Sequence, residues 1–101
     1  MSITVEIHGN TASIILSGGM DYSTQEEIRN ANNKALSANG VKEILVNFAE
    51  VTFLDSSAIR ALLMLQKQAD ANGKSLVLLN CKDSIRETFE VGGFDKMFTI
   101  R

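Results

Sequence analysis

Apolar and polar residues alternate over two stretches near the start of the chain, residues 3–8 (ITVEIH) and residues 11–17 (TASIILS). An alternation of period two predicts strands with one apolar face. Gly9-Asn10 between them is a two-residue turn signal. We therefore predict a β-hairpin, whose second strand is broken by Gly18-Gly19.

Short apolar runs later in the chain predict further strands. Residues 43–48 (EILVNF) and 75–80 (SLVLLN) are apolar and partly β-branched, which is typical of short buried strands. A final short strand is expected at residues 97–100.

The segments between these strands have the residue patterns of helices. The first predicted helix ends near Ala38 and begins at one of two capping-box pairs, Ser23 with Glu26 or Thr24 with Glu27. A second helix can be capped by Asp55 or Ser56 and ended by Gly73. A third follows the capping-box pair Ser84 and Glu87, and Gly92-Gly93 is expected to end it.

The predicted order of elements is ββαβαβαβ. Strands that alternate with helices imply right-handed crossovers and parallel pairing, while the opening hairpin adds an antiparallel pair. We expect an α/β fold in which residues 1–101 form a single domain, with helices packed on a mixed, mostly parallel sheet.

Composition removes several classes of function. The 101 residues include 10 basic and 12 acidic side chains, a formal net charge of −2, which gives no basic excess for binding nucleic acid. The longest apolar run, Ala61 to Leu65, is far too short to span a bilayer, and the first ten residues do not resemble a signal peptide. We expect a cytoplasmic protein without direct membrane insertion.

Catalytic groups are scarce. The chain has one histidine, His8, and one cysteine, Cys81, too few for a metal cluster of imidazoles and thiolates. Nothing in the predicted topology places His8 near Cys81 or a serine, and Gly18-Gly19 does not match a phosphate-binding loop. We predict that the protein is not an enzyme and binds no cofactor or metal.

Asp55-Ser56-Ser57 is the most informative motif, because a carboxylate and two hydroxyls meet at a predicted loop-to-helix junction. One interpretation is helix capping. The other is phosphorylation, since a phosphoryl group at a helix N-terminus meets the positive end of the helix dipole and adds surface charge without unfolding the domain.

These residues also carry a family resemblance. The sequence resembles the small STAS-domain proteins, the bacterial anti-sigma factor antagonists, over nearly its whole length. Three segments carry the likeness: residues 16–21 (LSGGMD), residues 46–57 (VNFAEVTFLDSS) and residues 90–94 (EVGGF). The resemblance implies that Ser56 is phosphorylated by a serine kinase and that Asp21 helps to form the partner surface.

The resemblance further implies partner switching that controls transcription through a sigma factor. The unphosphorylated antagonist would bind an anti-sigma factor that is also a serine protein kinase, phosphorylation would release it, and a metal-dependent serine phosphatase would reset it. The alternatives are a non-switching STAS subunit of a transporter or lipid-transport complex, and a small-molecule or nucleotide sensor. We expect a monomer when the protein is free.

Two departures from the family pattern are visible. Ala58 stands where the family commonly has glycine. Alanine suits a helix better than glycine does. Many relatives add a C-terminal helix, whereas Arg101 follows directly on the last predicted strand, so we expect one face of the sheet to be less covered.

The second predicted helix also offers a surface. If it begins at Ser56, its outward side holds Arg60, Leu63, Met64 and Lys67. Leu63 and Met64 are apolar and would cost little to desolvate on binding. The alternative is that Leu63 and Met64 pack under a neighbouring loop. The predicted partner-binding residues are Asp21, Asp55, Ser57, Arg60, Leu63, Met64 and Lys67.

Overall fold

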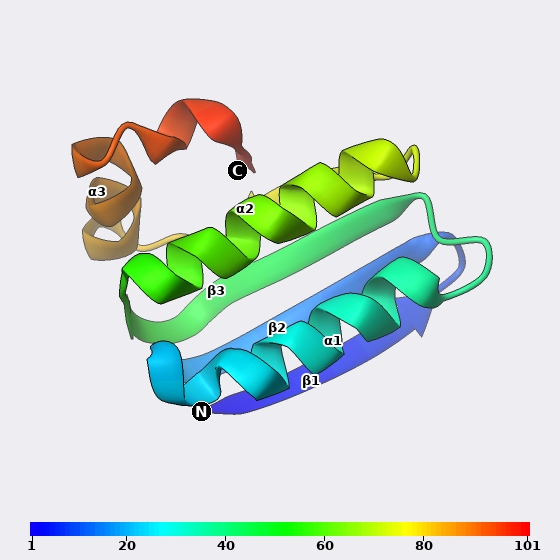
Figure 1. Ribbon diagram of the computed structural model, residues 1–101, viewed down its shortest axis with the longest axis horizontal. Coiled ribbons are helices and arrows are strands. Elements are labelled where there is room, and N and C mark those ends of the chain that lie inside the picture. Colours follow the sequence, from blue (N-terminus) through cyan, green and yellow to red (C-terminus); the bar gives the residue numbers. More distant parts are fainter.

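The computed structural model describes residues 1–101 and has the predicted order of elements, ββαβαβαβ (Figure 1). The strands are β1 (Ser2–His8), β2 (Thr11–Met20), β3 (Glu43–Leu54), β4 (Ser75–Leu79) and β5 (Thr99–Ile100). The helices are α1 (Gln25–Ser37), α2 (Ser56–Ala71) and α3 (Asp83–Val91), with short 3₁₀ turns η1 (Tyr22–Thr24) and η2 (Phe94–Met97).

One mixed sheet holds all five strands in the order β1-β2-β3-β4-β5. β1 pairs with β2 in an antiparallel hairpin that closes at His8 and Thr11, around Gly9 with a φ of 60°. The other three pairs of neighbours are parallel. The predicted fold class, a mostly parallel sheet with an N-terminal antiparallel hairpin, is therefore confirmed.

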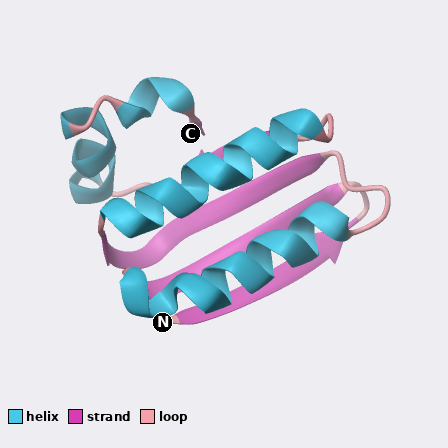
Figure 2. Cartoon of the chain, viewed as in Figure 1, coloured by secondary structure: helices cyan, strands magenta, loops and turns pink.

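α1 and α2 lie side by side over one face of this sheet, α1 above β1 and β2 and α2 above β3 and β4 (Figure 2). Every second residue of each strand points to the helices. Ala12, Ile44 and Leu76 are in register on this face and all are buried. On the opposite face, Leu45 and Leu79 are only half-buried. The strands predicted to be buried are buried on their helix-facing side, and β4 also has the buried Val77 on the other face, which is the less covered one.

An aromatic cluster joins α3 to the sheet. The rings of Phe48 and Phe89 meet edge to face with centroids 6.1 Å apart, and Phe89 also packs on Phe98 at 5.6 Å. Phe48 and Phe89 are completely buried. Such contacts add to the hydrophobic stabilisation from burial, so Phe89 is the main anchor of α3.

Gly18-Gly19 does not end its strand, contrary to the sequence prediction, because β2 continues to Met20. The pairing with β3 shifts register near these glycines, and Gly18 has a φ of 95°. Glycine accommodates such a bulge without steric cost. At Gly19 a Cβ would overlap the ring of Phe53, so the missing side chain makes room for that ring.

β3 is also longer than predicted, since it continues beyond residue 48 to Leu54. Val51 and Leu54 are buried in this extension, which pairs with the last residues of β2. The carboxyl ends of two adjacent parallel strands therefore lie at one edge of the sheet.

The start of the first helix differs from both predicted capping boxes. The capping box is formed by Asp21 and Thr24 around η1, and α1 then begins at Gln25. Glu26 and Glu27 lie in the first turn of α1, where acidic side chains interact favourably with the helix dipole.

Candidate functional site

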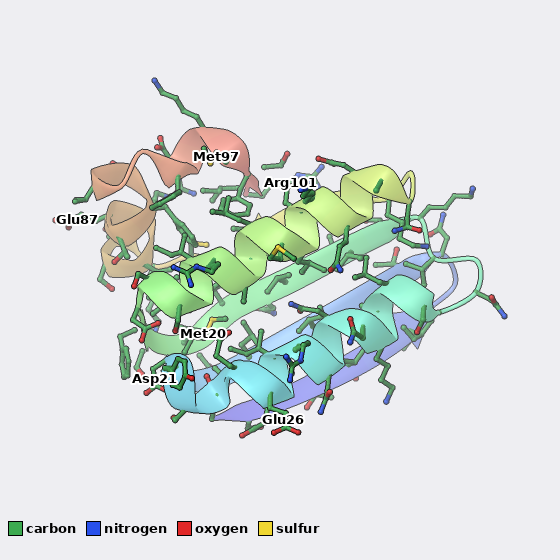
Figure 3. The ribbon with its side chains drawn as sticks, viewed as in Figure 1. Met20, Asp21, Glu26, Glu87, Met97 and Arg101 are labelled. Carbon is green, nitrogen blue, oxygen red and sulfur yellow. The ribbon has the colours of Figure 1, made fainter.

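The candidate site lies where β2 and β3 end and α1 and α2 begin. The backbone N–H of Asp55 donates a hydrogen bond to the carbonyl oxygen of Met20 at 3.1 Å, which holds the two strand ends together. Figure 3 shows Met20 and Asp21 at this edge of the sheet. The fold thus brings Asp21 close to the Asp55-Ser56-Ser57 segment, 34 residues later in the sequence.

Asp55, one of the two caps predicted, is the residue that caps α2. Its Oδ1 accepts hydrogen bonds from the Ser57 hydroxyl at 2.6 Å and from the backbone N–H of Ala58 at 3.0 Å. The Ser57 hydroxyl, followed by the Ala58 N–H, lowers the pKa of Asp55 because both bonds favour the charged carboxylate. The start of α2 is therefore capped by a side chain that is ionised at neutral pH.

The two serines after Asp55 have different environments. Ser57 is half-buried and its hydroxyl is engaged by Asp55. Ser56 is exposed as the first residue of α2, and its hydroxyl makes no hydrogen bond in the structure. Of the two, Ser56 has the side chain that a protein enzyme can reach without disturbing the helix cap.

Asp21 resembles Asp55 in that its carboxylate accepts a hydrogen bond from the hydroxyl of the serine two residues later. Its carboxylate accepts hydrogen bonds from both the backbone N–H and the hydroxyl of Ser23, two residues later. Thr24 completes the turn, since its hydroxyl donates to the Asp21 carbonyl at 2.8 Å. Asp21 is therefore held in place beside the start of α2.

The first turns of α1 and α2 are linked directly. Gln25 Nε2 donates to the carbonyl oxygen of Ser57 at 3.1 Å. This bond joins residues 32 positions apart in the sequence. It therefore aligns the first turn of α1 with the first turn of α2 beside the site.

The remaining predicted residues lie along α2. Arg60, Met64 and Lys67 are exposed, and Met64 leaves 53% of its surface accessible. Leu63 differs from them, because it is half-buried and packs against the core. The outward face of α2 therefore has one large apolar side chain, Met64, where the sequence suggested two.

Two exposed aromatic residues beside the site were not predicted. Tyr22, directly after Asp21, is 80% exposed, and Phe53 is 51% exposed two residues before Asp55. Leu54 is buried, so an extension of the predicted strand to residue 54 would have assigned its neighbour Phe53 to the outward side. Exposed aromatic side chains are enriched among residues that dominate protein interfaces.

Of the side chains considered for catalysis, His8 lies far from this edge of the sheet. His8 is exposed at the hairpin turn, at the opposite end of β2 from Met20. Cys81 is half-buried, and burial raises the pKa of its thiol while Arg86 opposes that change. The structure contains no group of three His, Cys, Asp or Glu side chains placed to hold a metal ion. No helix has the length and apolar character needed to cross a membrane.

Comparison with known proteins agrees with this architecture. The model of the STAS domain family matches residues 2–101. A STAS-domain containing protein of Pseudomonas aeruginosa (strain UCBPP-PA14) is 27% identical over 92 residues, covering 91% of this chain and 89% of that protein. The anti-sigma F factor antagonist of Paenibacillus polymyxa is 21% identical over 100 residues, covering 99% of this chain and 86% of the relative.

Solved structures give the same result. The anti-sigma factor antagonist SpoIIAA in its unphosphorylated form has a TM-score of 0.76 and 26% identity, covering 99% of this chain and 87% of that one. SpoIIAA of Bacillus in the phosphorylated form has a TM-score of 0.75, 26% identity, and covers 99% of this chain and 91% of that one. The chain belongs to the STAS domain family.

Proposed function

We propose that this protein is a phosphorylation-controlled anti-sigma factor antagonist. Its unphosphorylated form binds an anti-sigma factor that is also a serine kinase and so releases the sigma factor. Phosphorylation of Ser56 then separates the two proteins, and a metal-dependent serine phosphatase restores the hydroxyl. Because the kinase uses ATP, we expect this exchange in the cytoplasm.

The observation that carries the proposal is the contrast between Ser56 and Ser57. Ser56 is exposed at the start of α2, whereas the Ser57 hydroxyl is engaged at 2.6 Å by Asp55. A phosphoryl group on Ser56 adds roughly 1.5 to 2 negative charges at neutral pH. At a helix N-terminus this charge is tolerated by the fold, so its effect falls on the partner.

The surface around Ser56 is suited to a protein partner. Asp21 and Asp55 lie at its edge, the exposed residues Tyr22 and Phe53 are close to them in sequence, and the outward face of α2 continues it. A partner that buries the two aromatic rings would place Ser56 within the interface. The added phosphoryl charge would then have to be desolvated in the interface, which weakens binding. A relative, SpoIIAA, has been solved in phosphorylated and unphosphorylated forms, which supports the same kind of control here.

Incubation with the cognate kinase and ATP tests the phosphorylation site. The kinase is sought first among serine kinases encoded beside this gene. Peptide mapping by mass spectrometry should find phosphate on Ser56, and Ser56→Ala should abolish it while Ser57→Ala retains it. Phosphate on another residue, or modification of the Ser56→Ala protein, would overturn the assignment.

The charge mechanism has a separate test. Ser56→Asp should weaken binding to the kinase at least about tenfold without lowering the melting temperature, because an acidic residue in the first turn suits the helix dipole. Ser56→Asn has nearly the same size and no charge, so it serves as the control. Equal affinity of Ser56→Asp and Ser56→Asn would count against the mechanism. Copurification with a membrane transporter and no phosphate on Ser56 in cells would favour a non-switching subunit instead.

A further inference from the structure

A groove with a volume of about 210 Å³ lies between α1 and α2, beside the candidate site. Its lining contains two arginines, four side-chain amides and the side chains of one alanine and one methionine, with no acidic residue. The residues are Gln25, Arg29, Asn32 and Asn33 from α1, and Arg60, Ala61, Met64 and Gln68 from α2.

Arg29 and Arg60 are both exposed, and each lies one helical turn after the first residue of its helix. The hydrogen bond from Gln25 to Ser57 holds the first turns of α1 and α2 together. The two arginines therefore flank the groove at similar positions along the two helices. Two guanidinium groups that share a groove without a carboxylate repel each other. An anion bound between them would relieve this repulsion and accept charge-assisted hydrogen bonds.

Ser56 is placed to supply that anion. It precedes Arg60 by four residues on α2, and side chains at this spacing are neighbours on a helix surface, with Cβ atoms about 5–6 Å apart. We propose that Arg60 and Arg29 bind the phosphoryl group of phosphorylated Ser56, which rests on the phosphorylation of Ser56 proposed above. The groove is then the receiving site for the modification.

Phosphorylation changes the surface twice under this arrangement. It adds negative charge at Ser56, and it withdraws the guanidinium groups of Arg60 and Arg29 from contact with a partner. In the unphosphorylated protein the same guanidinium groups remain available to a carboxylate of the partner. Loss of this contact would therefore accompany repulsion by the added charge.

The test uses the full chain with phosphoserine incorporated at position 56 during synthesis, so neither the kinase nor the partner is needed. The ³¹P chemical shift is followed against pH, which gives the second pKa of the phosphoserine. A peptide of residues 53–58 with the same phosphoserine is the reference, because it retains Asp55 and lacks Arg60. We expect the pKa in the protein to lie at least about half a unit below that of the peptide, since nearby cations favour the dianion.

Substitutions separate the arginines from other influences. The N-terminus of α2 and the charge of Asp55 act on the phosphoserine in wild type and variants alike. Arg60→Gln should therefore raise the pKa toward the peptide value, and Arg29→Gln should raise it by a smaller amount. Lys42→Gln also removes one exposed cation, beside the hairpin turn at the start of β3 and so at the opposite end of that strand from Ser56, and as the control it should leave the pKa unchanged. Circular dichroism confirms that each variant is folded.

An unchanged pKa in Arg60→Gln would overturn the proposal, and a change in Arg60→Gln alone would overturn the part assigned to Arg29. Failure of the proposed phosphorylation switch would differ from both of these pKa results. It would leave partner affinity independent of phosphoserine at position 56, whatever the pKa of that group.

Discussion

The hydroxyl of Ser57 donates a hydrogen bond to Oδ1 of Asp55 across 2.6 Å, and this contact assigns different roles to two adjacent serines. Ser57 stabilises the start of α2, while Ser56 projects into solvent. Helix capping and phosphorylation, two interpretations of one motif, are therefore compatible because different side chains would perform them.

Ser57→Ala should lower the melting temperature by a few degrees, because it removes one hydrogen bond to the capping carboxylate. Ser56→Ala should leave it nearly unchanged, as is usual for an exposed position. Thermal unfolding followed by circular dichroism measures both. A larger loss in Ser56→Ala than in Ser57→Ala would show that the hydroxyl roles are reversed.

The cap also predicts how stability depends on pH. The pKa of Asp55 is lowered in the folded protein, so its carboxylate contributes stability that is present above the unfolded-state pKa of about 4 and is lost as the pH falls through the folded value. Asp55→Asn should reduce the difference in the free energy of unfolding between pH 5 and pH 3.

Urea denaturation at the two pH values provides the measurement. Glu50→Gln, at an exposed strand position, is the control for removal of one carboxylate. If Asp55→Asn and Glu50→Gln change the pH dependence equally, the cap does not depend on the charge of Asp55.

Phe53→Ala should weaken binding to the kinase partner by about tenfold or more, because large aromatic side chains dominate protein interfaces. Gly19→Ala should also weaken it, since the new Cβ would displace the Phe53 ring. Isothermal titration calorimetry measures both affinities. Met97→Ala is the control, because Met97 is similarly exposed at 56% but lies on η2. An effect of Met97→Ala as large as that of Phe53→Ala would place the interface elsewhere.

Phe89→Ala should reduce the free energy of unfolding by about 3–5 kcal/mol, the usual cost of removing a buried phenylalanine. The ring packs between Phe48 and Phe98, so its loss leaves a cavity beneath α3. Phe89→Leu should cost less because it fills most of that volume. Urea unfolding curves distinguish the two, and a loss below about 1 kcal/mol for Phe89→Ala would contradict the anchoring role.

The order of strands and helices could be predicted because hydrophobic periodicity and turn residues are local signals. The extension of β3 to Leu54 could not, because its pairing with the glycine bulge of β2 depends on tertiary contact. The Asp21–Thr24 capping box was hidden by two nearby pairs with equally suitable spacing. A helical wheel placed Leu63 near the polar face, whereas the packed structure half-buries it against the core.

The candidate site was predicted where it rests on contiguous residues. Asp55-Ser56-Ser57 marked the start of α2, but the distinction between its two hydroxyls needed hydrogen-bond geometry. The groove with Arg29 and Arg60 could not be found in the sequence, because its two sides come from helices that meet only in the folded chain.

The affinity of the kinase partner for two forms of the full chain tests the central claim most directly. One form has serine at position 56 and the other has phosphoserine, and isothermal titration calorimetry compares them under the same conditions. We predict tight binding of the unphosphorylated form and a decrease of at least about a hundredfold on phosphorylation, equivalent to about 2.7 kcal/mol. Equal affinities for the two forms would contradict the switch.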